Sequence, residues 1–197
     1  MPLGTWFSAG TSATVLVLAM SGAATAAPAP ASAPASEASP ARAAAVTLRY
    51  DDSGAAGWEA AVAAGVASWN ANVSNVRLVE ATSGSAAEIV IVATTGWPQA
   101  TLGPVRPGRQ VRVELGSQAV AQGYDRTRIA AHELGHSLGL PDTKPGPCSQ
   151  LMSGSSAGPA CTNATPDAAE RSRVQSAYAS AIAALALTDG RTLVDTP

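Results

Sequence analysis

The sequence contains two histidines, and both lie in one short stretch, His132-Glu133-Leu134-Gly135-His136. Residues four apart on a helix lie on the same face about one turn from each other, so the two imidazoles can bind one metal ion. Glu133 lies beside that face, where its carboxylate can take a proton from a water bound to the ion. Two nitrogen ligands with a neighbouring carboxylate base predict a zinc site that activates water for hydrolysis.

A catalytic zinc site usually has three protein ligands and one open position. The chain has no third histidine, and Asp142, further along than His136, is the candidate ligand. Gly139 lies between them, and a glycine can take the left-handed conformation that ends a helix and turns the chain back toward the metal. Two alternatives remain open. Asp142 is an ordinary turn residue after Pro141, or zinc takes a distant carboxylate such as Glu170.

The hydrophobic pattern predicts the elements that position these side chains. Strands are expected where apolar and polar residues alternate or where apolar residues follow one another, at residues 46–50, 76–80, 88–92 and 111–115. Helices are expected where apolar residues recur three and four apart, at residues 57–70, over the histidine motif as far as Gly139, and at residues 166–187. This order predicts an α+β domain in which helices pack on a mixed sheet.

Residues 94–109 show no periodicity and contain several glycines and prolines. They are therefore expected to form a long exposed loop. The strand that follows, at residues 111–115, alternates apolar and polar side chains and is expected at an edge of the sheet.

The start of the chain is expected to direct export rather than to belong to the fold. Residues 13–20 form an apolar run too short to span a bilayer, and small residues with an Ala-x-Ala cleavage site ending near Ala26 follow. We therefore expect a secretory signal peptide at residues 1–26. Residues 27–44 are rich in Ala, Pro and Ser and are expected to be a propeptide or linker, so the folded domain is expected at residues 45–197.

The net charge and the cysteine content indicate which partners and which cellular compartment to expect. A formal net charge of −2 gives no electrostatic reason to expect nucleic acid or an anionic membrane as a partner, and we expect a monomer. Cys148 and Cys161 flank a loop rich in Gly, Ser and Pro. In an exported chain two cysteines at this spacing favour a disulfide, whereas two free thiols would suit a cytosolic protein.

The pattern around the histidines extends to His132-Glu133-x-x-His136-x-x-Gly139-x-x-Asp142. It resembles the motif of the metzincin clan of zinc proteases, with aspartate in place of the usual third histidine. This replacement, in a small domain behind a secretory leader, resembles the snapalysins, the small neutral proteases of streptomycetes. The likeness covers most of residues 45–179, and further matching segments are Tyr124-Asp125-x-Thr127-Arg128, Leu138-Gly139-Leu140-Pro141-Asp142, Gly146-Pro147-Cys148-Ser149-x-Leu151-Met152-Ser153-Gly154, Gly158-Pro159-x-Cys161-Thr162-Asn163 and Glu170-Arg171-Ser172-Arg173-Val174.

The resemblance implies a role for each residue at the expected zinc site. The implied zinc ligands are His132, His136 and Asp142, and Glu133 is the implied general base. Met152 would lie in a Met-turn, a tight loop that places its thioether beneath the metal without binding it.

The resemblance also bears on residues around the site. It implies that Cys148 and Cys161 form the family's disulfide. Asp125 and Thr127 match positions at which the family is thought to hold a calcium ion, although both residues equally suit the start of a helix. Many metzincins carry a tyrosine two residues after the Met-turn methionine, where this chain has Gly154, so the residue that steadies the oxyanion is unassigned.

Taken together, the resemblance implies a small single metzincin-like domain with an active-site helix, a Met-turn and a C-terminal helix. The implied activity is that of a secreted zinc endopeptidase that cleaves proteins such as casein and favours an aromatic residue just after the scissile bond. An extended substrate is expected to pair with the edge strand at residues 111–115. Two other functions remain open: a zinc-dependent amidase acting on cell-wall peptide, and a secreted zinc-binding protein without catalysis, which would have no need of Glu133.

Overall fold

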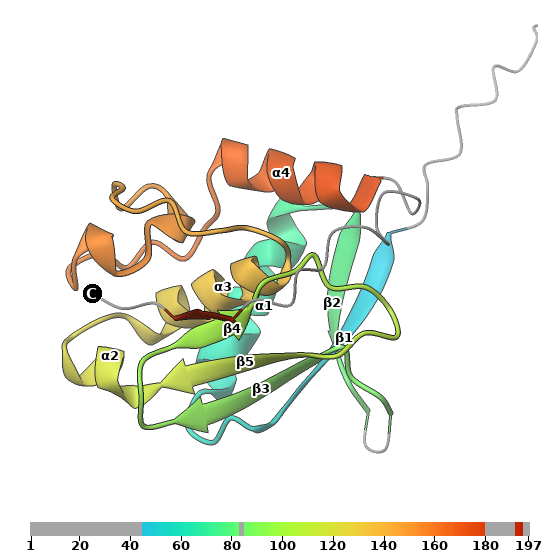
Figure 1. Cartoon of the computed structure of the whole chain (residues 1–197), viewed down its shortest axis with the longest axis horizontal. Coiled ribbons are helices and arrows are strands. Elements are labelled where there is room, and N and C mark those ends of the chain that lie inside the picture. Colours follow the sequence, from blue (N-terminus) through green and yellow to red (C-terminus); the bar gives the residue numbers. More distant parts are fainter. Residues whose placement is uncertain (1–44, 83–84, 180–191, 195–197) are drawn as a thin grey trace, which may run out of the picture. The chain divides into compact units, whose positions relative to one another are not determined.

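The computed structural model describes residues 45–82, 85–179 and 192–194. Its elements, shown in Figure 1, are β1 (Val46–Gly54), α1 (Glu59–Asn72), β2 (Val76–Glu80), β3 (Ile89–Thr94), β4 (Gln99–Thr101), β5 (Val111–Gly116), α2 (Ser117–Ala121), α3 (Arg126–Ser137), the 3₁₀ helix η1 (Leu151–Ala157), α4 (Ala168–Ala179) and β6 (Thr192–Val194). The expected signal peptide and propeptide lie outside the described residues, as does the end of the helix expected at residues 166–187. Within the described ranges, no helix is both long enough and apolar enough to cross a bilayer.

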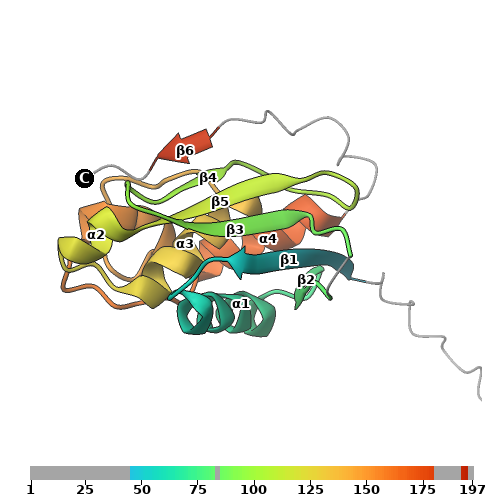
Figure 2. The same cartoon turned by 90° about the horizontal axis from the view of Figure 1, so that it is seen from below.

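The strands form one mixed sheet, which confirms the expected α+β fold. Their order across the sheet is β2-β1-β3-β5-β4-β6. β1 pairs in parallel with β2 and β3, and β3 pairs in parallel with β5. β4 runs antiparallel to both of its neighbours, β5 and β6. Figure 2 shows this order, with β6 outside β4 at one end of the sheet and β2 at the other.

Two predictions about the segment before β5 are wrong. Residues 94–109 are not simply an exposed loop, because they contain β4, and Ala100 and Val105 are fully buried. A strand as short as β4 has too few alternations to be recognised among the glycines and prolines that surround it. Because β4 pairs with β5 on the side opposite β3, residues 111–115 do not form an edge strand, and β5 is an inner strand of the sheet.

The helix that carries both histidines, α3, is packed on several sides. α1 buries one face against it, and Gly65 of α1 lies so close that an added Cβ would be 3.0 Å from the backbone nitrogen of Ala131. The indole Nε1 of Trp69 donates a hydrogen bond to the Ala131 carbonyl oxygen at 2.8 Å. α3 also packs against β4, β5 and η1. These contacts fix the position of α3 in the fold.

Candidate metal centre

Both ends of α3 are defined by individual residues. Asp125 is the N-cap, and its carboxylate accepts the N–H of Arg128 at 2.8 Å. At the other end Gly139 has a φ of 101°, which glycine adopts without the penalty that a Cβ imposes. The Leu140 N–H then donates to the Gly135 carbonyl oxygen at 3.0 Å, so the chain turns back directly after the helix. This turn brings the following residues toward the histidines.

The capping contact bears on the calcium site expected at Asp125 and Thr127. The Asp125 carboxylate accepts a backbone N–H, as the alternative role at a helix start requires. Among the described residues, the group of His, Cys, Asp and Glu side chains that could hold a metal ion consists of His132, Glu133 and His136. Calcium binding at Asp125 therefore stays a prediction.

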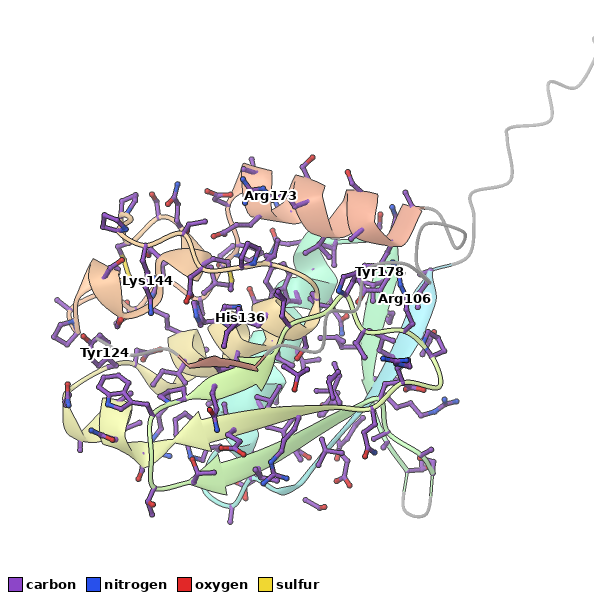
Figure 3. All side chains as sticks on the ribbon, viewed as in Figure 1. Arg106, Tyr124, His136, Lys144, Arg173 and Tyr178 are labelled. Carbon is purple, nitrogen blue, oxygen red and sulfur yellow. A yellow bond between two sulfur atoms is a disulfide. The ribbon has the colours of Figure 1, made fainter. Side chains whose placement is uncertain are left out.

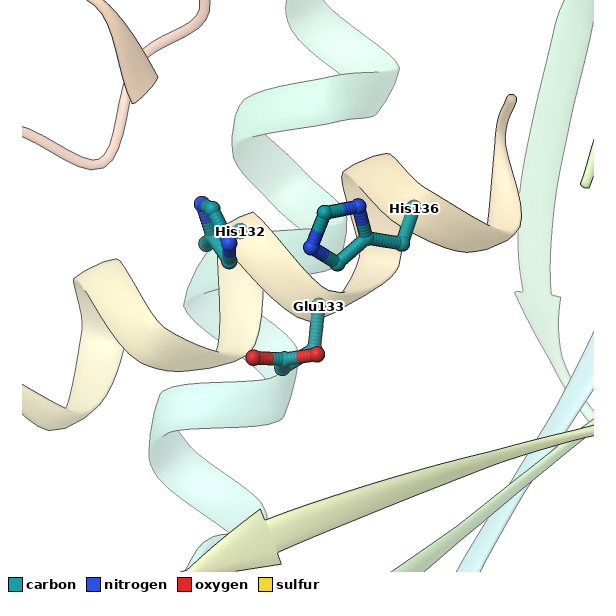
Figure 4. A group of neighbouring side chains, drawn as sticks. All are labelled: His132, Glu133 and His136. Carbon is teal, nitrogen blue, oxygen red and sulfur yellow. The ribbon is translucent and has the colours of Figure 1, made fainter. Parts of the chain in front are cut away.

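His132, Glu133 and His136 lie on neighbouring turns of α3, as Figure 4 shows. One ligand atom of each side chain lies within 4.8 Å of the other two. The two imidazole centroids are 4.6 Å apart, and the ring planes meet at 84°. All three residues are buried, with at most 1 % of their surface exposed. The three side chains, whose spacing was read from the sequence, thus form a compact and buried group in the structure.

Backbone carbonyl groups orient both imidazoles. His132 Nδ1 lies 3.0 Å from the carbonyl oxygen of Leu151, and His136 Nδ1 lies 2.7 Å from that of Leu140. Because a carbonyl oxygen can only accept, each Nδ1 carries a proton and donates it. A neutral imidazole in this tautomer has its lone pair on Nε2, which is the arrangement that binds a metal ion through Nε2.

Asp142 joins this group from the segment that follows α3. Its Oδ1 lies 3.3 Å from His132 Nε2 and 3.5 Å from His136 Nε2. Ligand atoms placed tetrahedrally at about 2.0–2.1 Å from a zinc ion are about 3.3 Å from one another, so these distances fit one ion among three ligand atoms. Two imidazole lone pairs and a carboxylate oxygen facing one point also repel one another unless a cation lies between them.

Lys144 and the histidines influence the ionisation of Asp142. Burial by itself would raise the pKa of this carboxyl. When the imidazoles are protonated, the hydrogen bond from His132 and the charges of His132, His136 and Lys144 outweigh burial, and the pKa of Asp142 lies below its ordinary value. Lys144 Nζ lies 3.7 Å from the second oxygen, Oδ2, and Figure 3 shows Lys144 on the same side of the molecule as His136. Lys144 is thus placed to hold the carboxylate with Oδ1 toward the imidazoles.

Glu170, the alternative zinc ligand, has a different role in the structure. Its carboxylate is buried and accepts the N–H groups of Leu151, Met152 and Asp167, at 3.2, 2.7 and 2.6 Å. Leu151 is also the residue whose carbonyl oxygen orients His132. Glu170 therefore acts on the site through η1, as a positioning residue.

We expect Glu170→Gln to weaken metal binding about 10-fold, in the range found for residues that orient metal ligands. The amide NH₂ group of glutamine would face backbone N–H groups that need an acceptor, so the Leu151 carbonyl would lose its fixed position. Competition with a chelating dye measures the zinc affinity, and Arg173→Gln, an exposed change on the same helix, is the control. Equal affinity in the two variants would show that Glu170 does not position His132.

Met152 packs against α3 at Gly135, which lies between the two histidines in the sequence. It is fully buried, and a Cβ added to Gly135 would be 2.6 Å from its sulfur and 3.1 Å from Cζ2 of Trp69. Gly154, two residues later, has a φ of 52° at a kink inside η1. Glycine at position 135 therefore lets Met152 of η1 pack closely against the helix that carries the imidazoles.

A disulfide and a buried arginine hold the loop that contains η1. Cys148 and Cys161 form the expected disulfide, with Cα atoms 5.5 Å apart. The guanidinium group of Arg128, which is buried in α3, donates to the carbonyl oxygens of Gln150 and Asn163 at 3.0 and 2.6 Å. These bonds tie the ends of the loop to the helix that carries the histidines.

Sequence reasoning did not assign the positioning roles of Arg128, Glu170 and Lys144. A charged residue inside an otherwise buried helix, such as Arg128, is a signal that could have been noticed, because such residues are almost never buried without partners. Nothing in the sequence pattern indicates which backbone groups Glu170 accepts, since these contacts depend on how the loop folds back.

The fold and the donor set define a class of site: a mononuclear metal centre with a carboxylate beside it, on a central helix packed against a mixed sheet, of the kind that zinc-dependent hydrolases use. The chain belongs to the Streptomyces extracellular neutral proteinase (M7) family, whose model matches residues 45–181. The resemblance to the small neutral proteases of streptomycetes is thereby confirmed.

Individual relatives agree with the family model. The chain is 45 % identical over 141 residues to an extracellular small neutral protease of Streptomyces coelicolor. The match covers 72 % of this chain and 63 % of that protein, so this chain spans less than two thirds of that relative. It is 40 % identical over 134 residues to the extracellular small neutral protease of Streptomyces caespitosus, covering 68 % of this chain and 98 % of that protein. Among solved structures, the archaemetzincin of Methanopyrus kandleri is 16 % identical, with 68 % and 96 % of the two chains covered and a TM-score of 0.45. Because this score is low, the family assignment depends on the sequence matches.

Proposed function

We propose that this protein is a secreted, zinc-dependent endopeptidase in which His132, His136 and Asp142 hold the zinc ion and Glu133 is the general base. The position of Asp142 carries the proposal. Its Oδ1 lies 3.3 and 3.5 Å from two Nε2 atoms whose rings are both oriented through Nδ1. Membership of a neutral proteinase family supports peptide-bond hydrolysis as the reaction.

The chemistry follows from the position of Glu133 next to His132 on α3. Zinc, when bound, polarises the carbonyl group of the scissile bond and makes a water molecule more acidic. Glu133 accepts a proton from the attacking water and passes it to the nitrogen of the leaving amine. Met152, packed against Gly135, supports the helix that carries the two imidazoles.

Export is part of the same proposal. Residues 1–26 would be the signal peptide, residues 27–44 a propeptide or linker, and residues 45–197 the protease domain. The relatives are named extracellular proteases, and the Cys148–Cys161 disulfide is of a kind that persists in oxidising compartments. Sequencing the amino terminus of the protein recovered from culture medium checks both cleavage sites.

The test of the proposed function is casein hydrolysis with and without the chelator 1,10-phenanthroline. We expect the chelator to abolish cleavage and added zinc to restore it, because three protein ligands release the ion reversibly. Sequencing the products checks the expected preference for an aromatic residue just after the scissile bond. A folded, zinc-loaded protein that cleaves cell-wall peptide and not casein would favour the amidase alternative instead.

A further inference from the structure

The sheet ends in a strand that comes from the C-terminal tail. β6 pairs antiparallel with β4, although the two strands are far apart in the sequence. The paired residues are Gln99 with Val194, Ala100 with Leu193 and Thr101 with Thr192. Figures 1 and 2 both show β6 along the outer side of β4. β6 lies beyond residue 181, where the match to the family model ends.

The outer edge of β4 lies next to the end of α3, the helix that carries the candidate metal centre. The segment after β4 is bonded to the end of α3, with the Gly103 N–H donating to the His136 carbonyl oxygen at 2.8 Å and the Val105 N–H to that of Ser137 at 3.0 Å. β4 itself packs against α3. The other edge strand, β2, lies at the opposite end of the sheet. Of the two edges, the one at β4 is therefore the edge along which an extended peptide would run beside His132, Glu133 and His136.

An extended peptide binds to a sheet edge through main-chain hydrogen bonds, in the manner of an added strand. β6 already uses the outer backbone groups of β4 in this way. In addition, the oxygens of Glu133 and the Nε2 atoms of both histidines are buried in the structure. The described conformation is thus one in which the sheet edge is occupied and the reacting groups are covered.

We infer that Thr192–Val194 is an internal peptide ligand that competes with substrate for the outer edge of β4. This inference rests on the proposed endopeptidase function, and it adds a form of regulation to it. A substrate binds only after the tail segment leaves, so the tail raises KM and leaves kcat unchanged. Because a tethered segment has an effective concentration in the millimolar range, even its weak pairing is expected to raise KM by about 10-fold.

The first experiment compares the full chain with a chain that ends at Arg191. We expect truncation to lower KM for a fluorogenic peptide about 10-fold at constant kcat. Replacing Leu193 and Val194 together by proline should do the same, because one of two adjacent N–H groups in a strand faces the partner strand and proline has none. The control is Leu193→Val with Val194→Ile, which keeps both N–H groups. Equal KM in all four proteins would overturn the inference.

The second experiment does not depend on hydrolysis. A labelled synthetic peptide of residues 191–197 is titrated into the truncated chain carrying Glu133→Ala, and binding is followed by fluorescence anisotropy. We expect binding to the truncated chain and at least 10-fold weaker binding to the full chain, whose own tail occupies the edge. If the proteins prove inactive but this difference is found, the proposed function fails and the docking of the tail stands. Peptide binding that is equal in the two chains, or absent from both, would overturn the docking of the tail.

Discussion

Glu133→Gln is expected to reduce kcat by about 10³-fold while zinc remains bound. Glutamine has the shape of glutamate but cannot take a proton from water at neutral pH, so the variant removes the base and preserves the packing of a fully buried residue. Zinc should be retained because the three proposed ligand atoms belong to other residues. Hydrolysis of a fluorogenic peptide gives kcat, and elemental analysis of the purified protein gives the zinc content.

A matched control for this variant is Glu80→Gln, which changes an exposed glutamate on β2 in the same way. It should keep the rate and the zinc content of the parent protein. If Glu133→Gln retained more than about one tenth of the parent rate, Glu133 could not be the general base, since such a group contributes at least about 10²-fold.

Asp142→Ala is expected to weaken zinc binding by at least about 100-fold, because even residues that only orient the ligands contribute about 10- to 100-fold. The two imidazoles would remain in place, since their Nδ1 atoms bond to carbonyl oxygens of Leu151 and Leu140. A zinc ion that binds the folded state raises the unfolding temperature. We therefore expect added zinc to raise the unfolding temperature of the parent protein much more than that of the variant.

Asp125→Asn is the control for Asp142, because it changes an aspartate on the other side of the histidine motif. Asparagine is as good an N-cap as aspartate, so this variant should fold and bind zinc like the parent protein. The same variant tests the predicted calcium site, since calcium binding there would depend on the carboxylate. If zinc raised the unfolding temperature of Asp142→Ala as much as that of the parent protein, Asp142 would not be a zinc ligand. The interpretation of Asp142 as an ordinary turn residue would then be favoured.

Much of the candidate site could be predicted because its residues are close together in the sequence. The spacing of His132 and His136 places them on one face of a helix, and the helix is present where it was expected. Gly139 has the positive φ that the turn toward Asp142 requires. Each of these predictions uses a regular local geometry, which does not depend on the rest of the fold.

The errors concern the sheet edge, and they share one cause. Residues 111–115 have the alternation of a strand with one exposed face, but alternation describes the two faces of a sheet and not its edges. Whether a strand lies at an edge depends on whether another strand pairs beside it. Here that partner is β4, three residues long and without a periodic pattern, so the sequence provided no sign of it.

The sequence by itself determined the helix, its two imidazoles, the neighbouring carboxylate and the alternating strands, because helix and strand periods impose these features within a few residues. Only the tertiary structure decided the rest. It brought Asp142 Oδ1 within 3.5 Å of both Nε2 atoms, directed the Glu170 carboxylate to the backbone of η1, and paired the tail with β4. The contacts of Glu170 and of β6 join segments that are distant along the chain, whereas Asp142 is close to the histidines in the sequence and reaches them through an irregular turn. They form when the hydrophobic core folds as a whole, and no local pattern of residues encodes which distant groups will meet.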